Sequence, residues 1–427
     1  MHSYLLKMSS IAVVFSFDAY PVSNIIETKK YQAAVDNNKV EYTILNYNKE
    51  AIQDGDVNNG KYRSVILSDT NTETSSRIIC YGIPQSIPIE QWKHTHGNEF
   101  NQNDFLVNEI IEGTMINLFY DERCKSWMIA TKTTVGGNNY YFKLNYGINE
   151  TEPEKTFKEM FIEAIGGNPK TDTLNSLPVL KKLQKDFIYS FVLQHPFNHL
   201  VLNIVEPKVY LVAIYYVNDE NQVQYINERD YEDWSCFQEE GCRIKFPKRV
   251  STTETTLEKL LAANENDRCD NLGVMITHIE TGDRCAIKNK NYEYVKQIRG
   301  NHPNLKYHYY ELLKNNRVYE FIYYFPRYYY LFCHFYTEFM VFAQELHRKY
   351  VQYYVKKDET IIPKNFAILR SRLHHEVYLP YKNTGVIVDN NRVIAFLLAL
   401  ETKELYYYIT GYDKKMAIAN EEVNVQE

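Results

Sequence analysis

The stretch between residues 109 and 134 holds the side chains with the clearest chemical meaning. An acidic residue, a glycine and a hydroxyl residue follow one another at Glu112–Thr114, and a second β-type run closes at Lys132 after a polar turn. Carboxylates hold metal ions or ribose, and lysines neutralise the charge that develops on phosphate. This stretch therefore holds side chains of the types that phosphate chemistry uses, together with Ile110, which has no reactive group.

This order of residues resembles the core of RNA-ligase-type nucleotidyltransferases. That core reads Lys-x-Asp-Gly-Ser, a strand ending in Asp, a short turn, then Trp and a strand ending in Thr-Arg-Gly or Thr-Lys-Gly. Three further segments resemble ligase motifs. Residues 186–201 resemble the strand Tyr-x-Phe-Glu-Leu-x-Ser-Pro-x-Asn-Arg-Ile-Val. Residues 271–276 resemble the Glu-Gly-Val-Val strand, and residues 286–292 resemble the closing Lys-x-Lys motif. The resemblance is to T4 RNA ligase 1-type enzymes over residues 60–295. A resemblance to giant-virus proteins extends through the C-terminal region.

The resemblance implies a lysine that attacks the α-phosphate of ATP to form lysyl-AMP. AMP then passes to an RNA 5′-phosphate, and a 3′-hydroxyl displaces it. Four catalytic positions of this mechanism hold apolar residues here: Ile110 for the nucleophile, Val192 and Leu272 for carboxylates, and Ala286 for the first closing lysine. Such side chains neither attack phosphate nor bind Mg²⁺. A charge rarely survives in an apolar pocket without partners, so a concerted loss is physically consistent. We predict no catalytic residue and no metal site.

Several polar residues remain at positions that the resemblance places around the nucleotide. The predicted nucleotide- or RNA-binding set is Arg63, Glu112, Gly113, Lys132, Lys288 and Lys290. One interpretation is a residual phosphate-binding groove. The other is that each is ordinary surface charge at a solvated strand end.

Composition narrows the class of protein. The chain has 427 residues, a formal net charge of −6 and 38 tyrosines. The net charge excludes a global basic surface for nucleic acid, although a local groove can still be basic. Seven cysteines without a Cys-x-x-Cys spacing predict a reduced intracellular protein. The aromatic run 328–346 contains His334, Glu338 and Glu345, so we expect no membrane span. The expected location is the cytoplasm of an infected cell, or a virion.

Hydrophobic periodicity changes near residue 300. Before it, short alternating runs predict strand pairs, including 62–68 with 77–81, 115–121 with 127–133, and 272–278 with 284–288, as well as strands at 187–194, 199–205 and 209–216. After it, residues 303–318, 328–356 and 364–380 read as helices. We expect an α+β protein: a nucleotidyltransferase-like domain of antiparallel sheets at 1–300, followed by a helical domain at 301–427.

Two weaker patterns also bear on function. His94 and His96 would share one face of a strand, as a metal pair does, but no third ligand is visible. Basic residues of the helical region alternate with tyrosines, a mixture that suits single-stranded RNA and equally suits a solvated helix face. This set comprises Arg348, Lys349, Lys356, Lys357, Lys364, Arg370 and Arg372, with Tyr350, Tyr353 and Tyr354.

Three functions follow as hypotheses. The first is a pseudoenzyme that binds single-stranded RNA or a viral protein partner without adenylation and without a cofactor. The second is an active RNA ligase that uses ATP and Mg²⁺, with a displaced nucleophile such as Lys125 or Lys132. The third is a structural virion protein. A labelled-ATP adduct assay separates the second from the others.

Overall fold

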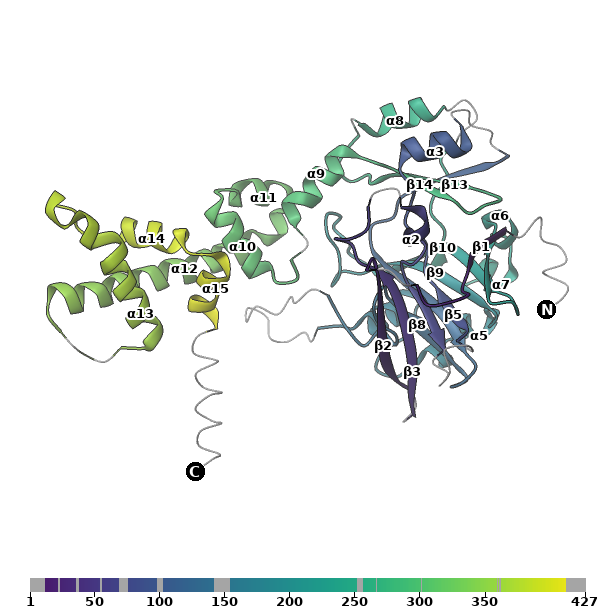
Figure 1. Ribbon diagram of the computed structural model, residues 1–427, viewed down its shortest axis with the longest axis horizontal. Coiled ribbons are helices and arrows are strands. Elements are labelled where there is room, and N and C mark those ends of the chain that lie inside the picture. Colours follow the sequence, from purple (N-terminus) through teal and green to yellow (C-terminus); the bar gives the residue numbers. More distant parts are fainter. Residues whose placement is uncertain are drawn as a thin grey trace. The chain divides into compact units, whose positions relative to one another are not determined.

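A computed structural model describes residues 12–21, 24–35, 38–53, 56–68, 76–97, 103–141, 154–251, 256–265, 267–300, 302–358, 360 and 362–411. Contacts divide the chain into two compact units, residues 1–145 with 150–297, and residues 146–149 with 298–427. Strands belong to the first unit, and the second is helical (Figure 1). The expected order, antiparallel sheets followed by helices, is confirmed.

The largest sheet forms the centre of the first unit. Its strand order is β1-β11-β10-β9-β7-β8, with β12 pairing in parallel with β10 and every other neighbour antiparallel. Every residue of β9 is buried, because both faces of this strand are covered. The strands are β1 (Ala12–Ser16), β7 (Thr114–Asp121), β8 (Ser126–Ala130), β9 (Phe187–Gln194), β10 (Lys208–Val217), β11 (Gln222–Ile226) and β12 (Ile244–Lys245).

Two smaller antiparallel sheets complete the unit. The four-stranded sheet has the order β2-β3-β4-β5, and the three-stranded sheet has the order β14-β13-β6. Their strands are β2 (Ile26–Val35), β3 (Asn38–Tyr47), β4 (Val65–Ser68) and β5 (Ile78–Tyr81), then β6 (Phe105–Glu109), β13 (Gly273–His278) and β14 (Arg284–Lys288). The expected strand pairs around residues 65–81, 114–130 and 273–288 are therefore present.

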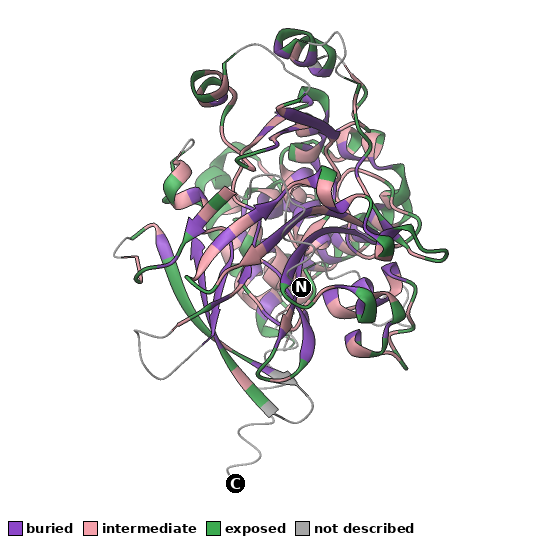
Figure 2. Ribbon diagram, turned by 90° about the vertical axis from the view of Figure 1, so that its right-hand side faces the viewer, coloured by how far each residue is buried: buried purple, intermediate pink, exposed green. Residues whose placement is uncertain are grey.

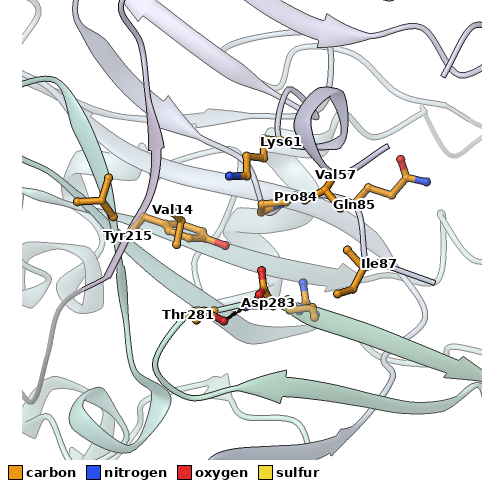
Figure 3. A pocket seen from close by; sticks show the side chains of 12 residues that line it. Val14, Val57, Lys61, Pro84, Gln85, Ile87, Tyr215, Thr281 and Asp283 are labelled. Atoms are coloured by element: carbon orange, nitrogen blue, oxygen red, sulfur yellow. Dashed lines mark hydrogen bonds between the residues drawn. The ribbon is translucent and has the colours of Figure 1, made fainter. Parts of the chain in front are cut away.

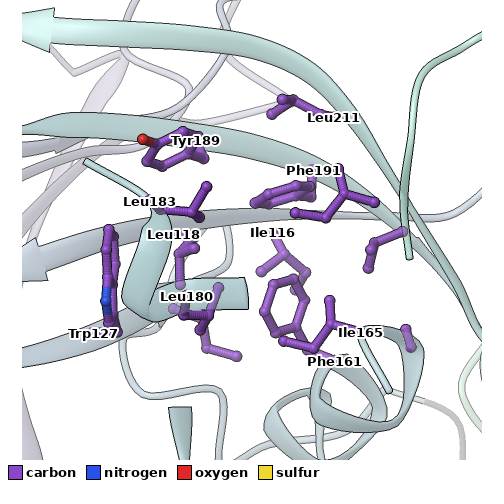
Figure 4. Close-up of a cluster of buried hydrophobic side chains, with 14 of the residues drawn as sticks. Ile116, Leu118, Trp127, Phe161, Ile165, Leu180, Leu183, Tyr189, Phe191 and Leu211 are labelled. Atoms are coloured by element: carbon purple, nitrogen blue, oxygen red, sulfur yellow. The ribbon is translucent and has the colours of Figure 1, made fainter. Parts of the chain in front are cut away.

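Each face of the large sheet has its own core, and Figure 2 shows buried residues concentrated along the strands. On one face Phe161, Leu180 and Phe191 pack together with other apolar side chains (Figure 4). On the other face, Phe119, Ile188 and Tyr215 share a core with the four-stranded sheet. The three-stranded sheet packs its own apolar face against helices α3 and α8.

Short helices follow the strands of the first unit. One of them, α4, begins with a capping box in which Thr156 and Glu159 satisfy each other's backbone N–H groups. The helices are α2 (Val57–Gly60), α3 (Ile89–His96), α4 (Phe157–Ala164), η2 (Leu174–Ser176), α5 (Pro178–Lys182), α6 (Glu228–Tyr231), α7 (Ser235–Gln238), α8 (Leu257–Glu265) and α9 (Lys290–Arg299).

The second unit is organised around one long helix. Phe332, Phe335, Phe339, Phe342 and Leu346 form its buried stripe, and it packs against α13 and α14, as the three- and four-residue spacing predicts. The elements are α10 (Leu305–Lys314), α11 (Val318–Tyr324), η3 (Pro326–Tyr328), α12 (Tyr329–Tyr350), η4 (Val351–Val355), α13 (Lys364–Leu373), η5 (His374–Tyr378), η6 (Leu379–Thr384), α14 (Asn390–Ala399) and α15 (Thr402–Thr410).

Two sequence-based expectations are wrong. Residues 199–205 form no strand, and their backbone instead folds over the Glu112 carboxylate. His94 and His96 lie on helix α3 rather than on a strand, because Trp92 anchors this segment as a helix on the three-stranded sheet. Among the described residues, no helix combines the length and apolarity that a membrane crossing requires.

Candidate functional site

A cleft lies between the large sheet and the three-stranded sheet, and its lining includes Val14 and Tyr215 of the first and Arg284 of the second. Gly282, in the β13–β14 turn, lies so close to Tyr225 that an added Cβ would stand 2.7 Å from its ring. Asn108 on β6 donates hydrogen bonds of 2.9 and 3.2 Å to the buried Glu228 carboxylate, which follows β11. These contacts hold the two sheets together at one side of the cleft.

The positions of the lost catalytic groups lie on the large sheet and on or beside the three-stranded sheet. On the large sheet, Val192 pairs with Met115 and lies against Gly113, where an added Cβ would meet Val192 Cγ1 at 2.7 Å and Leu193 O at 2.4 Å. This close approach requires glycine at position 113. The acidic–glycine–hydroxyl step therefore has a packing role that is independent of any ligand.

The other three lost positions belong to the three-stranded sheet or its margin. Ile110 donates its backbone N–H to Gly273 O at 3.0 Å, directly beside Leu272. Ala286 pairs with Met275, and Lys288 pairs with Gly273. Val192 and Leu272 are buried. Ile110 and Ala286 are partly exposed, and Lys288 is exposed.

The Glu112 carboxylate is fully engaged inside the protein. It accepts hydrogen bonds from the backbone N–H groups of Leu200, Val201 and Leu202, at 2.7, 3.1 and 3.0 Å, and from the Tyr292 hydroxyl at 2.9 Å. Burial, and next the Glu112 charge, raise the pKa of Tyr292. Glu112 therefore fastens two distant segments to the sheet, and a bound nucleotide would have to compete with four existing bonds.

Arg63 and Lys132 belong to neighbouring segments. Ser64 Oγ donates to Thr131 O at 3.2 Å, which joins the two segments side by side. The Lys132 ammonium donates to Tyr47 O at 3.0 Å and lies 4.1 Å from the centre of the Tyr47 ring. Burial, followed by repulsion from Lys49 and Arg63, lowers the pKa of Lys132 to about 8. A neutral amine is thus accessible near physiological pH.

A third cation, Arg284, begins β14 on the cleft side of the three-stranded sheet. Cys285 and Ile287 point into that sheet's core, so Arg284, Ala286 and Lys288 share the opposite face. Burial lowers the pKa of Arg284. The positive charge of Arg63 lowers this pKa further, whereas the Tyr215 and Tyr225 hydroxyls act to raise it. The groups that act most strongly on this guanidinium include no carboxylate.

A cavity of 230 Å³ opens beside Arg284. In Figure 3, Lys61 lies with Val57 and Pro84 at the top, Val14 and Tyr215 face Ile87, and the Asp283–Thr281 hydrogen bond lies below. The lining residues are Val13, Val14, Val57, Lys61, Pro84, Gln85, Ile87, Tyr215, Thr281, Gly282, Asp283 and Arg284.

Several of the remaining candidates lie on helices. Lys290 begins helix α9 and is exposed. In the helical unit, Arg348 and Arg372 are paired with Glu345 and Glu376, at 2.6 and 2.8 Å. Among the described residues, no three His, Cys, Asp or Glu side chains stand together as metal ligands do.

Several tyrosines of the predicted basic–aromatic surface are also turned inward. Tyr350 is buried, and Tyr354 stacks on His374 with ring centres 3.7 Å apart. Arg370 covers the Tyr353 ring at 3.7 Å. This surface offers fewer free cations and exposed rings than its sequence suggests.

Sequence reasoning missed Arg284, Lys61 and Gln85. The alternation Arg-Cys-Ala-Ile-Lys at residues 284–288 could have indicated that Arg284 and Lys288 share a face. No local signal could place Lys61 or Gln85 there, because they belong to other segments of the chain.

The fold and the site define an α+β unit with a cation-bearing cleft between antiparallel sheets. No family model matches the chain. It is 24% identical over 282 residues to the immediate-early protein ICP-46 homolog of Invertebrate iridescent virus 6, an overlap of 60% of this chain and 58% of that protein. The chain therefore spans less than two thirds of this relative.

Solved structures similar to this chain include RNA ligase from Naegleria gruberi. One mutant, with ATP and Mn, is 12% identical, with a TM-score of 0.36 over 67% of this chain and 86% of the ligase chain. Another mutant, in the apo form, is 13% identical, with a TM-score of 0.34 over 49% of this chain and 54% of the ligase chain. At these scores the argument on function rests on the residues of the cleft.

Proposed function

We propose that this protein is an RNA-ligase-like pseudoenzyme that binds the phosphate backbone of single-stranded RNA in the cleft. The observation that carries the proposal is a set of neighbouring cations, Arg63, Lys132 and Arg284, of which Arg284 lines the cleft. Arg63 acts electrostatically on both Lys132 and Arg284, and it lowers the pKa of each. Mutually repelling cations cost free energy in the unbound protein, and a bound anion removes that cost.

The apolar residues at the four lost positions support binding without adenylation. Ile110 cannot act as a nucleophile, and Val192, Leu272 and Ala286 supply neither metal ligands nor a charge for the phosphates. Ile110 and Ala286 are partly exposed and give an apolar surface there, whereas Val192 and Leu272 are buried. Such a surface suits the sugars and bases of a strand better than it suits a metal–triphosphate group.

Binding of a fluorescent single-stranded RNA, followed by anisotropy at low salt, tests the proposal. The affinity should fall steeply as salt rises, since each phosphate contact releases counterions. Arg63→Ala with Lys288→Ala should weaken binding, whereas Lys170→Ala with Lys181→Ala removes the same charge from exposed sites elsewhere in the same unit. If both double variants weaken RNA binding equally, the interaction depends on net charge alone and not on the proposed site. If RNA binding is undetectable, the hypothesis of a structural protein remains.

One observation favours the alternative of an active ligase, namely the lowered pKa of Lys132. A neutral lysine amine could attack the α-phosphate of ATP, so that a P–N bond forms, pyrophosphate leaves and the amine loses a proton to solvent. Lys125 is a poor substitute, because it lies in the β7–β8 turn, at the opposite end of β7 from Gly113.

Incubation with α-labelled ATP and Mg²⁺, followed by a denaturing gel, separates the two functions. We expect no covalent adduct. An adduct that disappears in Lys132→Arg would establish the ligase alternative and overturn the pseudoenzyme proposal.

A further inference from the structure

The cavity beside Arg284 combines positive charge with apolar walls. Lys61 and Arg284 line it together with one carboxylate, Asp283. Asp283 Oδ2 already accepts from Thr281 Oγ1 at 3.0 Å and lies 3.1 Å from His96 Nε2. Arg63 adds a third positive charge within electrostatic range of Arg284. The cavity is therefore suited to an anion.

Apolar side chains make up much of the remaining lining. Val14, Val57, Pro84 and Ile87 supply an apolar surface next to these polar groups.

We infer that this cavity binds a small phosphomonoester, with the phosphate at Lys61 and Arg284 and the organic part against the apolar lining. The inference rests on the proposed function, since it names the ligand of one end of the same cleft. A phosphomonoester carries close to two negative charges at neutral pH, and a guanidinium matches phosphate oxygens in pairs.

The size of the cavity favours a phosphate at the end of a molecule. An internal phosphodiester needs room for chain on both sides, whereas a volume of 230 Å³ admits one terminal group with a sugar. The phosphomonoester could therefore come from a free sugar phosphate or mononucleotide, or from the 5′ end of an RNA strand.

Calorimetric titration of the full chain with ribose 5-phosphate, uridine 5′-monophosphate, inorganic phosphate and ribose tests the inference. The two phosphomonoesters should bind, and ribose should not. Arg284→Met should weaken binding roughly tenfold or more, the loss expected for a charged hydrogen bond, and Arg284→Lys should retain part of the affinity.

Lys61→Gln guards against a folding defect of the Arg284 variants. Lys61 is half-buried at the end of α2 and lines the cavity, so its loss should weaken phosphomonoester binding severalfold while the thermal unfolding midpoint stays constant. Lys181→Gln, on an exposed part of α5, should change neither quantity. Equal binding of ribose and ribose 5-phosphate, or affinities unaffected by Lys61→Gln and Arg284→Met, would overturn the inference.

Two RNA oligonucleotides distinguish the sources of the phosphate. If a 5′-phosphorylated strand binds more tightly than its 5′-hydroxyl counterpart and Arg284→Met removes the difference, the ligand is an RNA end. If the strands bind equally while ribose 5-phosphate still binds, the ligand is a free phosphomonoester. Failure of the 5′-hydroxyl strand to bind at low salt contradicts the proposed RNA function alone and leaves the cavity site intact.

Discussion

Replacing Glu112 by glutamine should destabilise the N-terminal unit by a measurable amount. The Glu112 carboxylate accepts three backbone N–H groups and the Tyr292 hydroxyl, and three of these four donors bond to Oε2. The amide of glutamine would keep its oxygen at the Oε2 position. Its NH₂ group would then face the Leu200 N–H, which loses its acceptor.

The expected cost follows from these contacts. One orphaned donor costs about 1–3 kcal/mol, and three charge-assisted bonds become neutral ones of about half the strength, so the loss should total roughly 2–5 kcal/mol. Urea unfolding followed by circular dichroism measures it. Glu122→Gln, at an exposed turn position, serves as the control and should change the stability by less than about 0.5 kcal/mol.

The same variant decides whether Glu112 also binds a ligand. If its role is to fasten the chain, Glu112→Gln should lower stability and leave the RNA affinity of the folded protein unchanged. A variant with wild-type stability would refute this reasoning. A variant with wild-type stability but weakened RNA binding would restore Glu112 to the binding role predicted from sequence.

Further predictions concern the core, the cleft and pH. Phe191→Ala should cost about 3–5 kcal/mol in urea unfolding, because Phe191 is fully buried against Phe161. Gly273→Ala should cost about 2–4 kcal/mol in the same assay, since φ is +114° and the new Cβ would stand 2.0 Å from Ile287 O. Ile110→Lys alone should yield no lysyl-AMP on a denaturing gel, because Val192, Leu272 and Ala286 remain apolar. The folded Lys132 pKa of about 8 lies below the usual lysine value of about 10.4, so the unfolded chain binds more protons between these values. Stability should therefore rise from pH 8 to 9.5 relative to Lys132→Met, by less than about 2 kcal/mol because water reaches the ammonium; an identical pH dependence in both proteins would contradict the lowered pKa.

The sequence determined the architecture because its signals are local. Alternating apolar residues and polar turns fixed the hairpins at 114–130 and 273–288, and the stripe on α12 fixed its packing within the helical unit. The domain division into residues 1–300 and 301–427 stays a prediction. The motif order named Arg63 and Lys132 as binding candidates, which also stays a prediction, and the structure has their segments side by side.

Only the tertiary structure decided what the charged residues do. Glu112 reads as a ligand-binding carboxylate in sequence, yet its partners lie 88 to 180 residues away, at Leu200–Leu202 and Tyr292. Arg284 reads as an ordinary strand residue, and its role depends on Tyr215 and Arg63 from two other segments. Burial and electrostatic coupling arise from long-range contacts, which local patterns of residue type do not encode. For this reason the sequence named charged candidates, and the fold assigned the partners of those charges.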